Sequence, residues 1–273
     1  MTRMQTFERI VITGASSGIG EALARRWAGP GRSLALLARR EGRLRELAAE
    51  LRRQGAESLV YSCDLTHPDE VHHVIERLGM EMGAPDLLIC AAGQLAIANA
   101  DALDPGGLEA LLAVNLLGTI VVTQELLPLM ARRGGRIVHI ASLAALHPFR
   151  GIAGYAVTKW ALRGYHEALA AELVGGPIAL SIVYPSIVDT PMARSAADRT
   201  GTIPPVYDAW PARDVTLVCR RIARQIEAGR RRIFVSWEDR WLDRLLRLAP
   251  QTGPRILERL TTAKRSWRGK TPH

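Results

Sequence analysis

The sequence predicts an α/β fold, a doubly wound parallel sheet of about seven strands with helices on both faces. Short, continuously apolar runs alternate with amphipathic stretches along the chain, and strands that are apolar on both sides are typical of a parallel sheet covered by helices. Because crossovers between parallel strands are right-handed, a doubly wound sheet is the economical topology. With 273 residues, 48% of them hydrophobic, the chain is long enough for one large core.

The first half of the chain contains four strand–helix repeats. Apolar runs predict strands at residues 9–13, 33–38, 58–62 and 86–90. Stretches with apolar residues three or four apart predict helices at residues 18–28, 42–54, 67–82 and 108–132.

The second half continues the alternation and ends in a separate extension. Strands are predicted at residues 135–141, 178–183 and 232–236, and helices at 152–174 and 214–228. The stretch from 184 to about 211 reads as a loop. We therefore expect one domain over residues 1–236 and a basic helical extension over 237–273, packed on that domain.

The positive charge of the chain is concentrated near its C-terminus. Residues 1–203 carry 20 basic and 20 acidic side chains, whereas residues 204–273 carry 16 basic and 7 acidic ones, which accounts for the whole net charge of +9. This distribution argues against nucleic-acid binding by the main domain. No apolar run approaches the length of a membrane span.

The three cysteines are widely separated and have no metal-ligand spacing, so we expect no metal site. They also fit a reducing compartment, and no signal peptide is visible at the start of the chain. The sequence thus favours a cytoplasmic location.

A glycine-rich segment, Thr13–Gly20, follows the first strand and opens the first helix. Its glycines, at 14, 18 and 20, permit a tight turn and a close approach of the backbone to a pyrophosphate. The free N–H groups and positive dipole of the following helix favour the same anion. The segment predicts a dinucleotide site; the alternative is a glycine-rich connector.

Lysine occurs only at positions 159, 264 and 270, and arginine supplies nearly all other positive charge. Lys159 follows Tyr155 by four residues in a predicted helix, so both side chains lie on one face. The pair is compatible with an ordinary amphipathic helix. The pair also suits proton transfer. A positive charge about 4 Å from a phenol stabilises the phenolate by roughly 4 kcal/mol, which lowers the pKa of the phenol by about three units.

Together with Ser142 and Asn115, the segment Thr13–Gly20 and the pair Tyr155 and Lys159 resemble the short-chain dehydrogenase/reductase family in its single-domain form. The resemblance covers residues 7 to about 236. It implies a Rossmann fold, a nicotinamide cofactor, and a homodimer or homotetramer formed through the two long helices.

The resemblance also implies the roles of the four catalytic residues. Tyr155 exchanges a proton with the substrate oxygen, and Ser142 orients that oxygen. Lys159 lowers the pKa of the phenol and binds the nicotinamide ribose. Asn115 holds a water that links Lys159 to solvent.

The remaining cofactor contacts are implied by the family's motifs. Matching positions are Gly14, Ser16, Ser17, Gly18, Ile19, Gly20, Asp64, Leu65, Ala91, Gly93, Pro185, Val188 and Thr190. Two departures are visible: Cys90–Gly93 reads Cys-Ala-Ala-Gly where Asn-Asn-Ala-Gly is common, and Ser186 replaces a usual glycine. We expect the first to change local hydrogen bonding and the second to alter the path of the segment closing over the nicotinamide.

The end of the second strand indicates which nicotinamide the chain prefers. An acidic residue near this point binds the ribose 2′-hydroxyl of NAD, but residues 38–40 read Ala-Arg-Arg. Guanidinium groups suit a 2′-phosphate. We therefore expect NADP(H), with Arg39 as the principal contact and Arg40 beside the adenine; the alternative is that both arginines only begin a solvated helix.

The expected function is hydride transfer between NADP(H) and a carbonyl or alcohol carbon. Four residues are candidates for an apolar substrate pocket: Leu95, Leu143, His147 and Phe149. The competing function is a non-catalytic dinucleotide-binding sensor or scaffold. Epimerisation or dehydration is a third, although relatives with those activities usually carry a larger C-terminal domain.

The extension contains two predicted amphipathic helices, at 237–248 and about 254–267. In the first, Trp237, Trp241, Leu245 and Leu248 share one face. Tryptophan and arginine on such a helix can bind an anionic membrane surface. We favour packing of this apolar face over the substrate mouth or a subunit interface.

Overall fold

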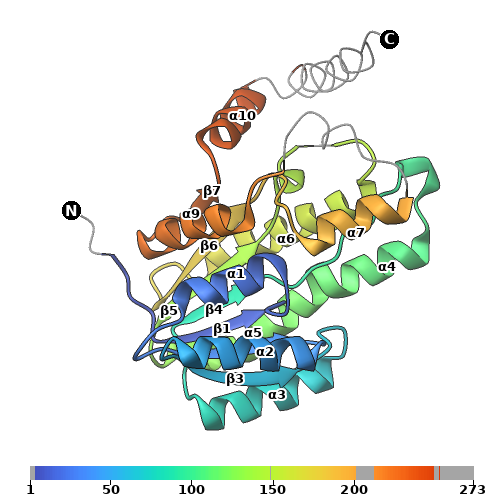
Figure 1. Cartoon of the computed structure of the whole chain (residues 1–273). Coiled ribbons are helices and arrows are strands. Elements are labelled where there is room, and N and C mark those ends of the chain that lie inside the picture. Colours follow the sequence, from blue (N-terminus) through green and yellow to red (C-terminus); the bar gives the residue numbers. More distant parts are fainter. Residues whose placement is uncertain (1–3, 148, 201–211, 249–251, 253–273) are drawn as a thin grey trace, which may run out of the picture.

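Seven strands form one parallel sheet in the order β3-β2-β1-β4-β5-β6-β7 (Figure 1). The computed structural model describes residues 4–147, 149–200, 212–248 and 252. The strands are β1 (Arg9–Thr13), β2 (Ser33–Ala38), β3 (Glu57–Ser62), β4 (Leu87–Cys90), β5 (Gly135–Ile140), β6 (Ile178–Tyr184) and β7 (Arg232–Phe234). The predicted fold class and all seven predicted strands are confirmed.

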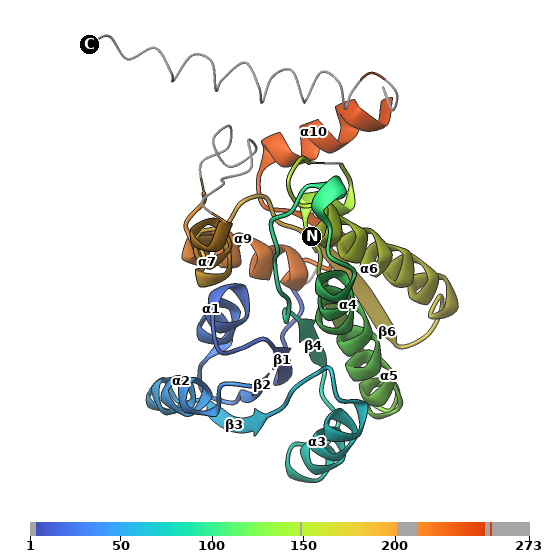
Figure 2. The same cartoon turned by 90° about the vertical axis from the view of Figure 1, so that its right-hand side faces the viewer.

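Helices cover both faces of the sheet, as Figure 2 shows most clearly. Their bounds are α1 (Gly18–Trp27), α2 (Glu41–Arg53), α3 (Pro68–Glu81), α4 (Pro105–Leu112), α5 (Gly118–Ala131), α6 (Ala153–Glu172), α7 (Pro191–Thr200), α9 (Val215–Glu227) and α10 (Trp237–Leu248). In that view α1, α2 and α9 lie on one side of the strands and α3, α5 and α6 on the other.

The alternation of side chains along each strand fills two separate apolar layers. In β1, Ile10 and Ile12 pack toward α1, α2 and α9, whereas Val11 packs toward α3, α5 and α6. All three side chains are fully buried. This two-sided burial explains why the strands are apolar without interruption.

The helix predicted at 108–132 extends over residues 105–131 and contains a π-helical turn, Ala113–Leu117. Contrary to the expectation from the sequence, it is long and apolar enough to cross a membrane. Its own contacts explain part of that composition, because Val122, Leu126 and Met130 are fully buried against the sheet and α3. It is a core helix of the α/β domain.

The segment predicted as a loop after residue 184 contains the helix α7. Pro191 occupies its first turn, where proline is favoured because the missing N–H would have no partner inside the helix. The Thr190 hydroxyl accepts a hydrogen bond from the Ala193 amide at 3.4 Å. The weak apolar pattern of this stretch gave no helical signal.

The helix predicted at 237–248 is present as α10, and its apolar face does not pack against the described part of the domain. Trp237, Trp241, Leu245 and Leu248 point to solvent, with exposed fractions of 58% to 86%. The residues that face the domain are Asp239, Asp243 and Leu246. The second predicted helix of the extension, with Lys264 and Lys270 near or beyond its end, lies outside the described residues.

Candidate active site

A cavity of about 320 Å³ opens at the carboxyl ends of β1, β4, β5 and β6. Gly14, Ala91, Ala141 and Pro185 each line it, and each directly follows one of these strands. The chain runs from β1 outward to β3 and returns with β4 on the other side of β1. Such a reversal leaves a crevice between the connecting loops, which is where α/β sheets bind ligands.

The glycine-rich loop is built so tightly that side chains would not fit. Gly14 has φ +67°, and a Cβ there would lie 2.7 Å from the Ala92 backbone. A Cβ on Gly20 would lie 2.5 Å from the Gly14 carbonyl oxygen. The missing side chain of Gly20 therefore lets α1 pack closely against the loop. Gly20 itself does not line the cavity.

The beginning of α1 faces the cavity with unused hydrogen-bond donors. Ser16, Ser17, Gly18 and Ile19 all line the cavity. The N-cap residue Ser17 makes no side-chain bond to the helix, which leaves the first amides of α1 without a side-chain cap. Amides in this position, with the helix dipole behind them, suit a pyrophosphate.

The loop after β4 is fastened to the end of β1. The Thr13 hydroxyl oxygen accepts hydrogen bonds from the amides of Ala91 and Ala92, both at 3.2 Å. Because the donors are main-chain amides, these two bonds form whether the segment reads Cys-Ala-Ala-Gly, as here, or Asn-Asn-Ala-Gly. Cys90 packs in the core, and burial raises the pKa of its thiol to about 12.

Two arginines stand at the end of β2 on the rim of the cavity. Arg40 donates hydrogen bonds to the hydroxyls of Ser16 and Ser17, the latter at 2.7 Å. The Arg39 guanidinium lies 3.6 Å from the Asp64 carboxylate and is 60% exposed. Partial burial opposes ionisation of Asp64, but hydrogen bonds from Thr66 and the charge of Arg39 lower its pKa below the ordinary value.

Lys159 is buried beneath Tyr155, and both side chains line the cavity. The Lys159 ammonium nitrogen lies 5.6 Å from the Tyr155 ring centre and donates a hydrogen bond to the Ile140 carbonyl at 3.1 Å. Burial lowers the pKa of Lys159 to about 8. A group with that pKa still carries its charge at neutral pH.

Asn115 is fully buried in the π-helical turn and ties three elements together. Its amide group exchanges two hydrogen bonds with the Gln94 backbone, at 2.7 and 2.9 Å, and donates a third to the Thr158 hydroxyl. Thr158 bonds in turn to the Tyr155 carbonyl. A π-helical turn often marks a functional site, and here it aims Asn115 between the β4 loop and α6.

The cavity's remaining predicted contacts lie on the loops after β5 and β6. Ser142 lines the cavity, and its hydroxyl accepts a hydrogen bond from the Ala144 amide at 3.1 Å. Val188 and Thr190 lie on the segment after Pro185, and Thr190 is the neighbour of Gly18 across the cavity. Ser186 also lines the cavity, and its hydroxyl oxygen is buried.

One end of the cavity has an apolar wall. Of the four predicted pocket residues, Leu95, Leu143 and Phe149 line the cavity. His147 does not. It is buried beneath α10 with its Nε2 atom 3.9 Å from the Asp243 carboxylate, and burial lowers its pKa to about 4.

Several lining residues were missed by the sequence reasoning. Ile152, Met192 and Leu242 extend the apolar wall. Leu242 comes from α10, about 100 residues after Ser142 along the chain, and no local pattern connects the two. Arg39, Arg40, Asp64, Leu65 and Gly93 do line the cavity as predicted.

These features fit an extended dinucleotide. The cavity is lined by the first residues of α1, by the two arginines that follow β2, and by Lys159. A Cβ on Gly93 would lie 3.1 Å from the Asn115 side-chain oxygen and 3.7 Å from the Lys159 nitrogen, so a larger residue here would crowd Asn115.

Comparison with known proteins decides the family. Residues 8–201 match the family model described as short chain dehydrogenase. The chain belongs to the short-chain dehydrogenase/reductase family. It is 35% identical over 199 residues to an uncharacterized oxidoreductase of Mycobacterium tuberculosis, covering 70% of this chain and 78% of that protein. It is 32% identical over 183 residues to an uncharacterized oxidoreductase of Staphylococcus epidermidis, covering 67% and 78%.

Solved structures of short-chain dehydrogenases have the same fold. One from Sphingobium yanoikuyae in complex with NADPH has a TM-score of 0.76 at 25% identity, covering 97% of this chain and 96% of that one. One from Burkholderia phymatum in complex with NAD has a TM-score of 0.77 at 25% identity, covering 90% and 94%. This chain is an NAD(P)-dependent oxidoreductase of the short-chain dehydrogenase/reductase family.

Proposed function

We propose that this short-chain dehydrogenase transfers hydride between NADP(H) and the carbonyl or alcohol carbon of a hydrophobic substrate. The observation that carries the proposal is the meeting of Tyr155, Lys159 and Ser142 in one cavity beside an apolar wall. When bound, the nicotinamide supplies or accepts the hydride, and the protein's own groups manage the proton and the orientation of the substrate.

Tyr155 is the proposed proton donor in reduction and the base in oxidation. A free phenol, with a pKa near 10, is a weak base at neutral pH. A buried ammonium beneath the ring favours the phenolate and so brings proton transfer closer to the working pH. The hydrogen bond to the Ile140 carbonyl holds the Lys159 nitrogen in that place.

Ser142 and Asn115 are the proposed positioning groups. The Ser142 hydroxyl accepts a bond from the Ala144 amide, which leaves its own proton available for the substrate oxygen. Asn115 bonds to the Gln94 backbone and Thr158. It fixes the loop over Lys159 and the turn of α6 that precedes it.

A preference for NADP(H) is supported by the rim of the cavity. Arg39 and Arg40 follow β2 directly, and no acidic side chain takes the position that would bind a ribose 2′-hydroxyl. Arg39 is exposed enough to reach a 2′-phosphate, which would add a second anionic partner to the one it has in Asp64. Arg40, bound to Ser16 and Ser17, orders the adjacent loop.

The apolar wall supports a hydrophobic ketone, aldehyde or alcohol as substrate. Two further proposals concern assembly and location. Exposed apolar side chains on the long helices, among them Leu117, Val157 and Trp160, support a homodimer or homotetramer. Three buried free cysteines support a cytoplasmic location.

An NADPH-consumption screen over hydrophobic ketones, aldehydes and 3-oxoacyl thioesters tests the proposal. We expect turnover with at least one of these classes and much weaker turnover with sugars and hydroxy acids. Binding of NADPH without turnover of any carbonyl would favour the sensor or scaffold. Turnover with NADH alone would overturn the cofactor assignment but leave the reaction class intact.

A further inference from the structure

The outer face of α10 is apolar and uncovered by the described part of the chain. Trp237, Trp241 and Leu245 are 70%, 60% and 58% exposed, and Leu248 is 86% exposed. At 3.6 residues per turn these four positions fall within one quarter of the helix circumference. Large apolar side chains gathered in this way on a protein surface mark a binding face.

The orientation of α10 is fixed by polar contacts on its inner face. Asp243 accepts hydrogen bonds from Arg232 at 3.4 Å and from Arg247 at 3.1 Å. The Asp239 amide bonds to the Ser236 hydroxyl, and Leu246 is buried. The inner face of α10 thus carries Asp239, Asp243 and Leu246, and the four large apolar residues lie on the opposite side of the helix.

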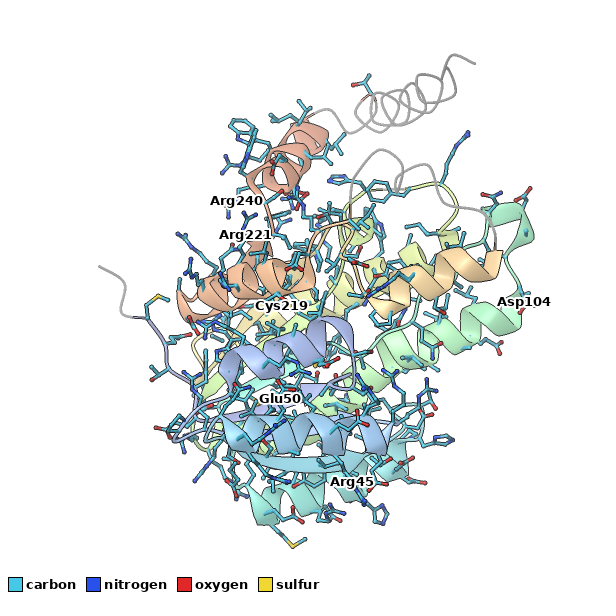
Figure 3. All side chains as sticks on the ribbon, viewed as in Figure 1. Arg45, Glu50, Asp104, Cys219, Arg221 and Arg240 are labelled. Atoms are coloured by element: carbon cyan, nitrogen blue, oxygen red, sulfur yellow. The ribbon has the colours of Figure 1, made fainter. Side chains whose placement is uncertain are left out.

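A strip of arginine lies along one edge of the apolar face. Arg240 and Arg244 are exposed and form no ion pair within the described residues; Arg240 extends from the margin of the molecule in Figure 3. Five arginines and one acid line a shallow hollow beside this strip, together with Phe234: Arg230, Arg232, Arg240, Arg244, Arg247 and Asp243. Asp243 pairs with Arg232 and Arg247, which leaves an excess of positive charge in the hollow. The exposed acid on α10, Glu238, is already 3.7 Å from Arg213.

We propose that α10 binds the surface of an anionic phospholipid bilayer. Tryptophan and leucine on one face, with arginine at its edge, are the composition of helices that lie in the membrane interface. The arginine-lined hollow adds a place for a lipid phosphate. The basic excess of residues 204–273, a net of +9, strengthens attraction to a negatively charged leaflet.

A second copy of the chain fits this surface less well. In a symmetric dimer formed through α10, the same patch of each copy would meet its counterpart. The arginine strips of the two copies would then lie close together, with Glu238 already paired to Arg213. Lipid phosphates neutralise the same strip without that repulsion.

The membrane-binding face and the active-site cavity lie on two sides of one helix. Leu242, on the inner side of α10, lines the cavity, whereas Trp241 beside it in the sequence faces outward. α10 on a bilayer would thus hold the apolar end of the cavity close to the lipid. This placement agrees with a hydrophobic substrate but does not depend on the proposed reaction.

Co-sedimentation of the full-length protein with vesicles tests the proposal. We expect binding to vesicles of phosphatidylcholine mixed with phosphatidylglycerol, weak binding to phosphatidylcholine alone, and release at high salt. The double variants Trp241→Ala/Leu245→Ala and Arg240→Gln/Arg244→Gln should each weaken binding about tenfold or more. All four side chains are exposed, so the thermal unfolding midpoint should stay unchanged.

Matched variants far from α10 serve as controls. Met80→Ala removes a 79% exposed apolar side chain on α3, at the opposite end of the molecule from α10 (Figure 1). Arg43→Gln/Arg45→Gln removes two exposed cations from α2. Vesicle binding equal in the α10 variants and these controls would overturn the proposal. So would loss of an oligomer in Trp241→Ala/Leu245→Ala, without vesicle binding by the parent protein, because the partner would then be a second copy.

Discussion

The ammonium group of Lys159 lies 5.6 Å from the ring centre of Tyr155 and is held there by the Ile140 carbonyl. Ile140 is the last residue of β5, so the end of a buried strand positions the cation and α6 positions the phenol above it. The proximity predicted from Tyr-x-x-x-Lys is therefore reinforced by a contact that the local sequence does not reveal.

Lys159→Met is expected to stabilise the fold while it abolishes turnover. Burial lowers the pKa of Lys159 from 10.5 to about 8, so below pH 8 the native state bears the full cost of a buried charge. After allowance for the lost bond to Ile140, the gain in free energy of unfolding near neutral pH should be about 2 kcal/mol. Urea denaturation measures it.

The pH dependence of that gain follows from the direction of the shift. As pH rises from about 8 toward 10.5, the native lysine loses its proton before the unfolded one does, so the cost of burial fades. The advantage of Lys159→Met should shrink over this window. A variant less stable than the parent at neutral pH, or a difference independent of pH, would contradict the account.

Arg39→Ala should weaken NADPH binding about tenfold or more, because a charge-assisted bond to the 2′-phosphate is lost. NADH affinity should change little. Arg43→Ala is the matched control, since Arg43 is exposed on α2 and pairs with Glu46 instead. Calorimetric titration with NADPH and with NADH measures both affinities. Unchanged NADPH affinity in Arg39→Ala would contradict the proposed preference for NADP(H).

Gly14→Ala should destabilise the fold by about 2 kcal/mol or more and disrupt cofactor binding. The residue has φ +67°, and the new Cβ would lie 2.7 Å from the Ala92 backbone. Gly42→Ala is the control, because a Cβ there meets nothing within 4 Å and alanine favours the helix. Equal thermal unfolding midpoints for the two variants would contradict this description of the loop.

Asn115→Ala should lower the free energy of unfolding by about 2 kcal/mol, because both polar groups of the Gln94 backbone lose their partner. The Michaelis constant for NADPH should rise as the loop over Lys159 loosens. Asn99→Ala, at an exposed cap without a side-chain hydrogen bond, is the control. The pair is compared by denaturation and by steady-state kinetics; an unchanged Michaelis constant for NADPH in Asn115→Ala would contradict the positioning role.

The sheet was predictable because each strand is buried on both faces and therefore uninterrupted in its apolar character. In residues 10–12, for example, successive side chains enter the two apolar layers in turn, so every position has to be apolar. The glycine loop was predictable for a related reason, since Gly14 has to adopt a backbone conformation and a spacing that other residues do not tolerate.

The parts that the sequence left open or mispredicted depend on contacts with distant elements. The periodicity of α10 identified a helix correctly, but Arg232 on β7 decides that Asp243 turns inward and Trp241 outward. Asp243 also lies near His147, which is buried under α10 and does not line the cavity. In α7, a proline at the first turn and a threonine cap formed a helix without an apolar stripe.

The most direct test of the central claim is the turnover number of Tyr155→Phe together with its affinity for NADPH. The phenol is the proposed proton donor, and the remaining ring keeps its position over Lys159. We predict that the turnover number falls about a thousandfold or more while NADPH affinity stays within about a factor of three of the parent value. Turnover close to that of the parent, with NADPH still bound, would contradict the proposed chemistry.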